Sequence, residues 1–257
     1  MRADLVTRLR AAGCVFAEEE AAILLEASNA DPAALEPMLE RRVAGEPLEH
    51  IVGWVEFGRL RLAIGPGVFI PRQRSLLLAR AAARVAAEQP APVVLEPYCG
   101  VAPLAATIAA AVPAAELHVA DIDPAALAWA RKNLPAHAGI HRADRLDGLP
   151  ASLRGRITLI AAVPPYVPVP EAELVPRDLR EHEPAEALFG GVDGLDHVRA
   201  LLAEAPEWLA PGGKVLLELN RRQAPAAAAH ARASGLYASH RTGPDGQTAI
   251  LRASMVD

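Results

Sequence analysis

Residues 93–124 read VVLEPYCGVAPLAATIAAAVPAAELHVADIDP and decide the fold. The run VVLE (93–96) is apolar up to its last residue, an acid, which is typical of a buried strand. The alanine-rich stretch that follows predicts a helix, and LHVAD (117–121) predicts a second strand. Asp123 before Pro124 indicates the start of another helix, because aspartate caps a helix and proline fits its first turn. Strands that alternate with helices through short turns indicate a parallel sheet covered by helices.

The same alternation continues to the end of the chain. ITLIAA (157–162) and KVLLEL (214–219) are further strand-like runs, and we expect a helix near 195–209 between them. Two late runs, GLYASH (235–240) and QTAILRA (247–253), predict an antiparallel pair that closes the sheet. The sequence therefore predicts an α/β fold with a doubly wound, mostly parallel sheet.

The first third of the chain has a different pattern. Apolar stripes at helical spacing predict short helices, and Asp31-Pro32 starts one that Pro37 should split into two pieces. The runs VEF and LRLAI, flanked by glycines, predict short strands before residue 70. We expect a helical domain with a short strand linker over residues 1–70 and a larger α/β domain over residues 71–257.

Composition restricts the class of protein. Of 257 residues, 52% are hydrophobic but only 4% aromatic, which predicts a core of alanine, valine and leucine. The net charge of −5 offers no basic excess for direct nucleic-acid binding, and no apolar stretch is long enough to span a membrane. Cys14 and Cys99 are too few for a disulfide framework, and the eight histidines show no metal-ligand spacing. We expect a soluble cytoplasmic protein without a metal, a nucleic-acid partner or a membrane.

Ligands of doubly wound sheets bind at the carboxyl ends of the strands, so the residues there are candidates for a site. Asp121 follows Glu96 by 25 residues, an offset at which an acid can accept hydrogen bonds from ribose hydroxyls; a helix cap or a surface acid is the alternative. The loop after Glu96 contains one glycine, Gly100, and by itself does not qualify as a binding loop.

A second candidate is the segment Val163-Pro164-Pro165-Tyr166, which follows a predicted buried strand. Its two prolines stiffen the backbone and remove two N–H donors, leaving carbonyl groups that can only accept. Such a turn suits a site that accepts hydrogen bonds from a substrate N–H group. A merely stiff loop is the alternative.

Motifs along nearly the whole chain resemble those of the HemK/PrmC-like release-factor glutamine methyltransferases, and are closest to a shorter paralogous branch. The most specific is EP-x-x-AL-x-GG-x-DGL, which spans residues 183–195. The resemblance implies a class I methyltransferase sheet, Rossmann-like, and a small helical amino-terminal domain that recognises the acceptor. The other matching residues are Glu46-Pro47-Leu48, Gly53, Glu56-Phe57, Ile70-Pro71-Arg72, the VADIDP run, VPPY, Pro211-Gly212-Gly213, Glu218 and Gln223.

The resemblance also implies S-adenosylmethionine as the cofactor and S-adenosylhomocysteine as its product. The family's D-x-G-x-G-x-G motif here places Tyr98 and Ala102 where the family has glycines, whose lack of a side chain lets the backbone approach the cofactor. Asp121 would hold the ribose, Asp144 the adenine edge and Gly100 the methionine tail. The implied cofactor-binding residues are Glu96, Tyr98, Gly100, Ala102, Asp121, Ile122 and Asp144.

In the family the acceptor motif is [N/D]PPY, and here Val163 stands in the first position, followed by Pro164, Pro165 and Tyr166. The resemblance implies that the asparagine oxygen and the first proline carbonyl accept the two N–H groups of a glutamine amide and aim its nitrogen at the methyl group. Pro164 keeps its carbonyl, but Val163 has no side-chain acceptor. The loss of one such contact costs about 3 kcal/mol, roughly a hundredfold in rate.

Three hypotheses remain open. The chain is a methyltransferase for a glutamine of a protein such as a release factor, as the resemblance implies. Alternatively, it acts on a small molecule in biosynthesis, because an amine or hydroxyl acceptor would not need the missing asparagine. The third is a non-catalytic descendant that binds the cofactor, a protein partner or neither, as expected if selection on the glycines and the asparagine had relaxed.

Overall fold

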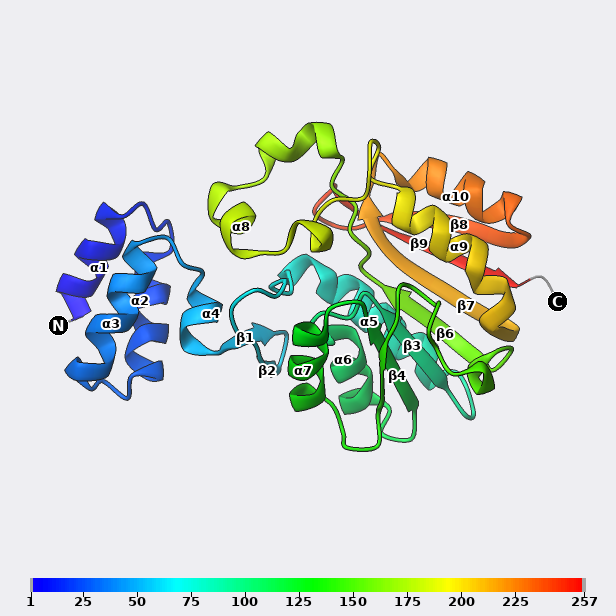
Figure 1. Ribbon diagram of the computed structural model, residues 1–257, viewed down its shortest axis with the longest axis horizontal. Coiled ribbons are helices and arrows are strands. Elements are labelled where there is room, and N and C mark those ends of the chain that lie inside the picture. The colour runs from blue at the N-terminus through cyan, green and yellow to red at the C-terminus, as the bar shows by residue number, and fades with distance from the viewer. Residues whose placement is uncertain (1, 256–257) are drawn as a thin grey trace.

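A seven-stranded sheet organises most of the computed structural model, which describes residues 2–255 (Figure 1). The strand order is β5-β4-β3-β6-β7-β9-β8, and β9 is antiparallel to both of its neighbours while the pairs from β5 to β7 are parallel. This confirms the predicted mostly parallel sheet with an antiparallel closing strand. The strands are β3 (Val93–Pro97), β4 (Glu116–Asp121), β5 (Gly139–Arg142), β6 (Ile157–Ala162), β7 (Leu209–Asn220), β8 (Leu236–Thr242) and β9 (Thr248–Met255).

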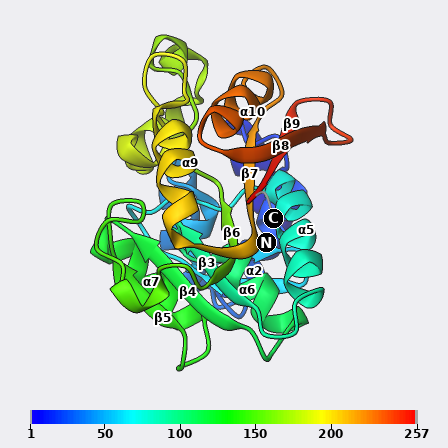
Figure 2. The same ribbon diagram turned by 90° about the vertical axis from the view of Figure 1, so that its right-hand side faces the viewer.

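Helices cover both faces of the sheet (Figure 2). Helices α5 (Leu76–Ala87), α6 (Pro103–Ala111) and α7 (Pro124–Asn133) pack on one face, and α9 (Asp196–Trp208) and α10 (Ala224–Ala233) on the other. Successive strand residues point to opposite faces, so Val94 is buried in the first core while Leu95 is buried in the second. Both cores consist mainly of alanine, valine and leucine, as the composition predicts.

The amino-terminal helices form a separate core at the end of the molecule away from the sheet (Figure 1). They are α1 (Arg2–Ala11), α2 (Ala17–Ala27), α3 (Pro32–Val43) and α4 (Leu48–Val52). The prediction that Pro37 divides α3 is wrong, because the helix continues through it. Leu35 and Leu39, on either side of Pro37, are buried, and this packing offsets the hydrogen bond that proline cannot make.

Two short strands connect the helices to the sheet. The hairpin of β1 (Trp54–Phe57) and β2 (Leu60–Ala63) is antiparallel, and its buried side chains belong to the core on the first face of the sheet. Packing therefore associates this hairpin with the larger part of the chain, whereas the predicted division at residue 70 placed it with the helices. The division itself stays a prediction.

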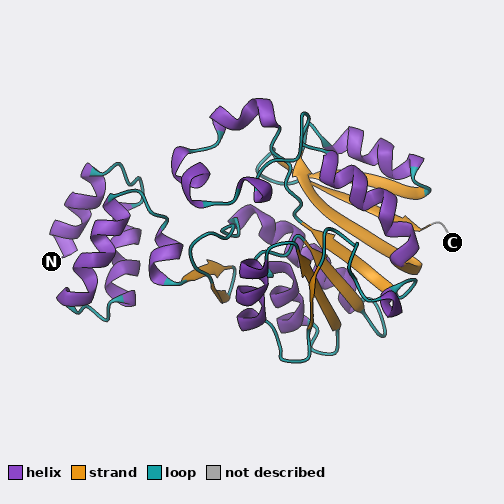
Figure 3. Ribbon diagram, in the orientation of Figure 1, coloured by secondary structure: helices purple, strands orange, loops and turns teal. Residues whose placement is uncertain are grey.

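Residues 163–195, here called the β6–α9 segment, cross from the sheet toward the amino-terminal helices (Figures 1 and 3). The segment is mostly irregular and contains α8 (Arg177–His182) and two 3₁₀ turns, η3 (Val169–Leu174) and η4 (Ala185–Ala187). Two further 3₁₀ turns are η1 (Gln73–Ser75) and η2 (Ala151–Leu153). Within residues 2–255, none of the helices has the length and apolar character needed to cross a membrane.

Candidate active site

A cavity of about 880 Å³ lies at the carboxyl ends of β3, β4 and β6, between the sheet, the linker before α5 and the β6–α9 segment. This is the edge at which doubly wound sheets bind their ligands, and the volume suits a small-molecule site. Every site residue predicted from the sequence lines this cavity except Ala102, which is fully buried. The structure thus brings together the two groups of candidates: Glu96, Tyr98, Gly100, Asp121, Ile122 and Asp144, and Val163, Pro164, Pro165 and Tyr166.

The loop between β3 and α6 keeps a glycine-like backbone although two of its glycine positions are occupied by other residues. Tyr98, Gly100 and Ala102 have φ angles of +55°, +52° and +62°. This left-handed conformation costs roughly 1–2 kcal/mol for a residue with a Cβ atom. Tyr98 and Ala102 therefore hold the backbone shape that glycine would adopt without strain.

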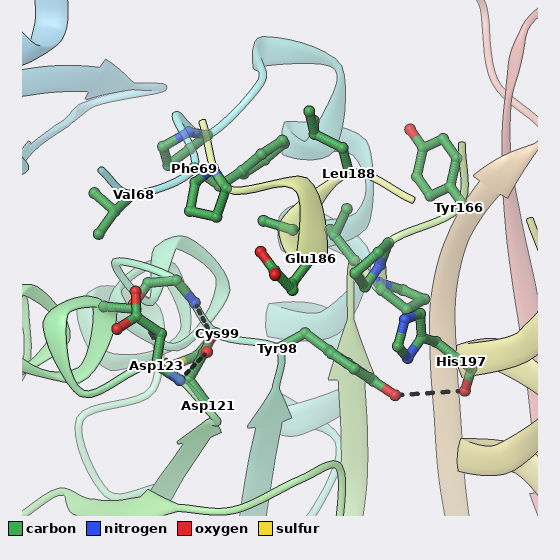
Figure 4. A pocket seen from close by; sticks show the side chains of 18 of the residues that line it. Val68, Phe69, Tyr98, Cys99, Asp121, Asp123, Tyr166, Glu186, Leu188 and His197 are labelled. Atoms are coloured by element: carbon green, nitrogen blue, oxygen red, sulfur yellow. Dashed lines mark hydrogen bonds between the residues drawn. The ribbon is translucent and has the colours of Figure 1, made fainter. Parts of the chain in front are cut away.

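Space for a ligand remains beside Gly100. A Cβ atom placed on Gly100 would meet no other atom within 4 Å. The Tyr98 ring turns toward His197, to whose carbonyl its hydroxyl donates a hydrogen bond of 3.4 Å, and it points away from Asp121 (Figure 4). Burial raises the pKa of Tyr98, so its hydroxyl is a neutral donor. The tyrosine narrows the cavity on the side of α9 and leaves the side of Gly100 open.

Glu96 has a structural partner that the sequence did not reveal. Its two carboxylate oxygens accept hydrogen bonds from the backbone N–H groups of Leu104 (3.2 Å) and Ala105 (2.6 Å) at the start of α6. Ala102, which precedes this helix, has no side-chain acceptor, so Glu96 caps the helix from β3. Burial raises the pKa of Glu96 to about 8. Glu96 therefore fixes the start of α6 and, with it, the end of the loop that precedes this helix.

Asp121 is held in a fixed orientation at the edge of the cavity. Its Oδ2 accepts a hydrogen bond from the Gly100 N–H (2.9 Å), and its Oδ1 accepts one from the Asp123 N–H (3.0 Å) (Figure 4). Burial raises its pKa, and the two backbone donors oppose this shift. The neighbouring side chain of Ile122 is 57% exposed, and Asp144 forms an ion pair with Arg145 (2.9 Å). This wall of the cavity thus combines a positioned carboxylate, an exposed apolar side chain and a second acid.

The segment Val163–Tyr166 forms the opposite wall. Pro164 and Pro165 are buried, and among the described residues no donor is paired with the Pro164 carbonyl oxygen. Gln223, at the start of α10, donates hydrogen bonds to the carbonyl oxygens of Tyr166 (2.8 Å) and Asp193 (3.0 Å). One side chain therefore joins the VPPY segment to the far end of the β6–α9 segment.

Two glycines of the GG-x-DG stretch are required by this junction. A Cβ atom on Gly190 would overlap the carbonyl oxygen of Pro165, and one on Gly194 would overlap that of Tyr166. Gly194 also has a φ angle of +75°, which disfavours other residues. Gly190 and Gly194 therefore allow the end of the β6–α9 segment to pack closely against the backbone of Pro165 and Tyr166 at its beginning.

Tyr166 contacts a buried acid. Its hydroxyl lies 3.2 Å from Oε1 of Glu218, which is completely buried at the end of β7, and Nε of Arg74 lies 3.5 Å from the same oxygen. Burial and the neighbouring Glu218 raise the pKa of Tyr166 to about 12. Burial also raises the pKa of Glu218. The Tyr166 side chain is thereby anchored at the edge of the VPPY wall.

Comparison with known proteins identifies the family. No protein-family model matches the chain. The release factor glutamine methyltransferase of Deinococcus radiodurans is 38% identical over 215 residues, which cover 84% of this chain and 77% of the relative. The chain belongs to this family. Another relative, the 4-amino-L-phenylalanine/4-methylamino-L-phenylalanine methyltransferase of Streptomyces pristinaespiralis, is 34% identical over 221 residues, or 84% of this chain and 75% of the relative.

Solved structures agree on the fold. The 16S rRNA N2 G1207 methyltransferase of Thermus thermophilus, determined with S-adenosylmethionine and guanosine, superimposes with a TM-score of 0.55 at 20% identity. The match covers 79% of this chain and 50% of that one. The family and the fold of this chain are thus those of S-adenosylmethionine-dependent class I methyltransferases, as the sequence motifs imply.

Two motifs of the family, Ile70-Pro71-Arg72 and Glu183-Pro184, are in contact in the structure. The Arg72 guanidinium lies 2.5 Å from Oε2 of Glu183, and the Ile70 N–H donates a 3.0 Å hydrogen bond to Oε1 of the same residue. Burial raises the pKa of Glu183, whereas Arg72 and the Ile70 donor oppose the shift. The linker and the β6–α9 segment are joined here, and together they close the outer side of the cavity.

The β6–α9 segment also contributes wall residues that the sequence did not single out. They are apolar apart from Glu186, whose carboxylate is directed into the cavity (Figure 4). The only available signal was position, since Glu186 occupies one of the two variable places of EP-x-x-AL. The apolar residues are Val167, Leu174, Val175, Pro176, Leu179, Ala185 and Phe189.

Proposed function

We propose that this chain transfers a methyl group from S-adenosylmethionine to a nitrogen atom of an acceptor bound in the same cavity. The observation that carries the proposal is the loop of Tyr98, Gly100 and Ala102, which keeps its left-handed backbone and leaves open space beside Gly100. A loop that had lost contact with a ligand would have no reason to retain this strain. A descendant that has lost the cofactor is therefore less favoured than a chain that binds it.

The residues present suit the cofactor. Gly100 permits close backbone approach, Asp121 retains free lone pairs for ribose hydroxyls, and Ile122 and Asp144 lie on the wall where the adenine would bind. Tyr98 borders the site. Glu96 stabilises the loop through its hydrogen bonds to the start of α6, and Ala102 is buried at the end of the loop. When bound, S-adenosylmethionine supplies an electrophilic methyl group on a positively charged sulfur.

The acceptor would bind against the VPPY wall. The free carbonyl of Pro164 can accept one N–H of the acceptor, and Pro165 and Tyr166 fix the direction of approach. Val163 adds only apolar contact. The amino-terminal helices are proposed to recognise the acceptor when it is a protein.

The first candidate acceptor is a glutamine side chain in a protein, the substrate class named for the Deinococcus radiodurans relative. The second is an amino group of a small molecule. It is favoured by Val163, which cannot accept an amide N–H, and by the relative named for methylation of 4-amino-L-phenylalanine.

Calorimetric titration with S-adenosylhomocysteine tests the proposal. We expect binding by the wild-type chain and at least about a tenfold loss in Asp121→Asn, since a hydrogen bond to a charged group contributes about 1.5–3 kcal/mol. Asp147→Asn is the matched control, because this nearby acid is exposed and lies outside the cavity lining. Absence of binding at millimolar ligand would falsify the cofactor-dependent function.

A further inference from the structure

Glu186 is an unpaired acid in a largely apolar cavity. It lies in the turn η4, and in the view of Figure 4 its carboxylate lies between Phe69 and the loop that carries Cys99. Among residues 2–255 it has no hydrogen-bond or ion-pair partner. The arginines of the cavity wall are already engaged: Arg72 with Glu183, Arg74 with Glu218, and Arg145 with Asp144 and Glu204.

The other acids of the cavity are less suited to meet an acceptor. Asp144 pairs with Arg145, and Asp123 accepts a hydrogen bond from the Ala125 N–H at the start of α7. Both oxygens of Glu96 accept from the start of α6, and those of Asp121 accept from Gly100 and Asp123. Glu218 is completely buried beside Tyr166. Glu186 is exposed, and it belongs to the same segment as the apolar acceptor wall.

A carboxylate attracts an ammonium group more strongly than a neutral amide, because a hydrogen bond between charged partners is stronger than one between neutral groups. Val163 removes the acceptor that would orient an amide. Building on the methyl transfer proposed above, we propose that Glu186 receives the amino group of the acceptor, and that the acceptor is a primary or secondary amine on an apolar body and not a carboxamide.

In the proposed reaction the acceptor nitrogen loses a proton and then takes the methyl group from the cofactor sulfur. The acceptor amine, oriented by Glu186, loses one proton to the solvent to which this exposed residue is open, which frees the nitrogen lone pair. The lone pair forms the new N–C bond while the S–CH₃ bond breaks and its electron pair stays on sulfur. The positive charge moves from sulfur to the methylated nitrogen. The Pro164 carbonyl can accept a remaining N–H and hold the nitrogen in line.

Two matched probes separate the possibilities: 2-phenylethylamine and 3-phenylpropanamide, which share an apolar ring but present an amine or an amide. Their affinities are measured calorimetrically with the full chain saturated by S-adenosylhomocysteine. We expect the amine to bind at least about tenfold more tightly than the amide, and Glu186→Gln to abolish this preference. Glu181→Gln, an exposed acid of the same segment outside the cavity lining, should retain it.

The outcomes distinguish this proposal from the function on which it rests. Failure of the wild-type chain to bind S-adenosylhomocysteine overturns the methyl transfer itself. Intact binding of S-adenosylhomocysteine, with an amine that binds no better than the amide, overturns the amine assignment alone. A Glu186→Gln variant that loses S-adenosylhomocysteine affinity would assign Glu186 to the cofactor and also overturn it.

Discussion

The Arg72 guanidinium and the Glu183 carboxylate lie 2.5 Å apart, although 111 positions separate them in the chain. Glu183 is buried, and the Ile70 N–H donates to its other oxygen. The linker before α5 and the β6–α9 segment are therefore held together by one charged pair at the outer side of the cavity.

Removing Arg72 should weaken the fold around the cavity. Arg72→Ala leaves the Glu183 carboxylate buried without its cation, and we expect a loss of about 3 kcal/mol in the free energy of unfolding measured in urea. Arg177→Ala, which breaks an exposed pair with Glu181, should leave stability nearly unchanged. Equal midpoints for the two variants would contradict the importance of the buried pair.

Replacing Ala102 by glycine should be nearly neutral. Glycine removes the strain of a left-handed alanine, which stabilises the fold by roughly 1–2 kcal/mol. The substitution also removes a buried methyl group and makes the unfolded chain more flexible, and these two effects together destabilise the fold by about as much. Ala105→Gly is the control, because Ala105 is equally buried but lies in helix α6, where we expect a loss of about 2 kcal/mol. Thermal unfolding of both variants checks the difference, and a similar loss in each would argue against strain at Ala102.

Restoring an amide acceptor at position 163 should favour glutamine. In Val163→Asn we expect methyl transfer to a Gly-Gly-Gln peptide to rise by about a hundredfold, since one positioned polar contact is worth about 3 kcal/mol in the transition state. Transfer of label from the methyl donor measures the rate. Val163→Ala removes the same apolar contact without adding an acceptor and should give no gain. If both variants gain equally, the size of the side chain and not its oxygen controls the reaction.

The buried Glu96 should make stability depend on pH. Its pKa is raised from the ordinary carboxyl value to about 8 by burial, so the folded state binds the proton more tightly than the unfolded state. Stability then falls as the pH rises from about 4.5 to about 8, by an amount on the order of 4 kcal/mol.

Comparison with Glu96→Gln isolates this effect from the other buried acids. Burial also raises the pKa of Asp121, Glu183 and Glu218, and these groups remain in the variant. We expect the difference in unfolding free energy between the two chains to change across this pH range in chemical denaturation. A difference that stays constant from pH 5 to pH 8 would show that Glu96 does not titrate there.

The sheet could be predicted because each central strand is a buried apolar run that ends at a turn or an acid, as at Val93–Pro97 and Glu116–Asp121. The edge strand Gly139–Arg142 was missed because it is short and half-buried, with no apolar alternation. Helix α10 was missed for a related reason. Its run of alanines contains no contrast between apolar and polar positions to reveal a helical period.

The position of the site was predictable, but the direction of its side chains was not. The ends of the parallel strands placed Asp121 and Val163 at one edge of the sheet. That Glu96 turns to α6 and Tyr98 toward His197 depends on packing between elements far apart in the sequence. Glu186 belongs to a segment whose path is determined by Glu183 and Gln223, so no local pattern could locate it.

The loop after β3 shows that the sequence of a motif can change while its backbone conformation is kept. Judged by its letters, EPYCGVA departs from a glycine-rich signature at two of three places. All three of these positions nevertheless have positive φ angles, the range that glycine adopts without strain. A search among divergent relatives by torsion sign at these alternate positions would recover chains that a search for glycine discards.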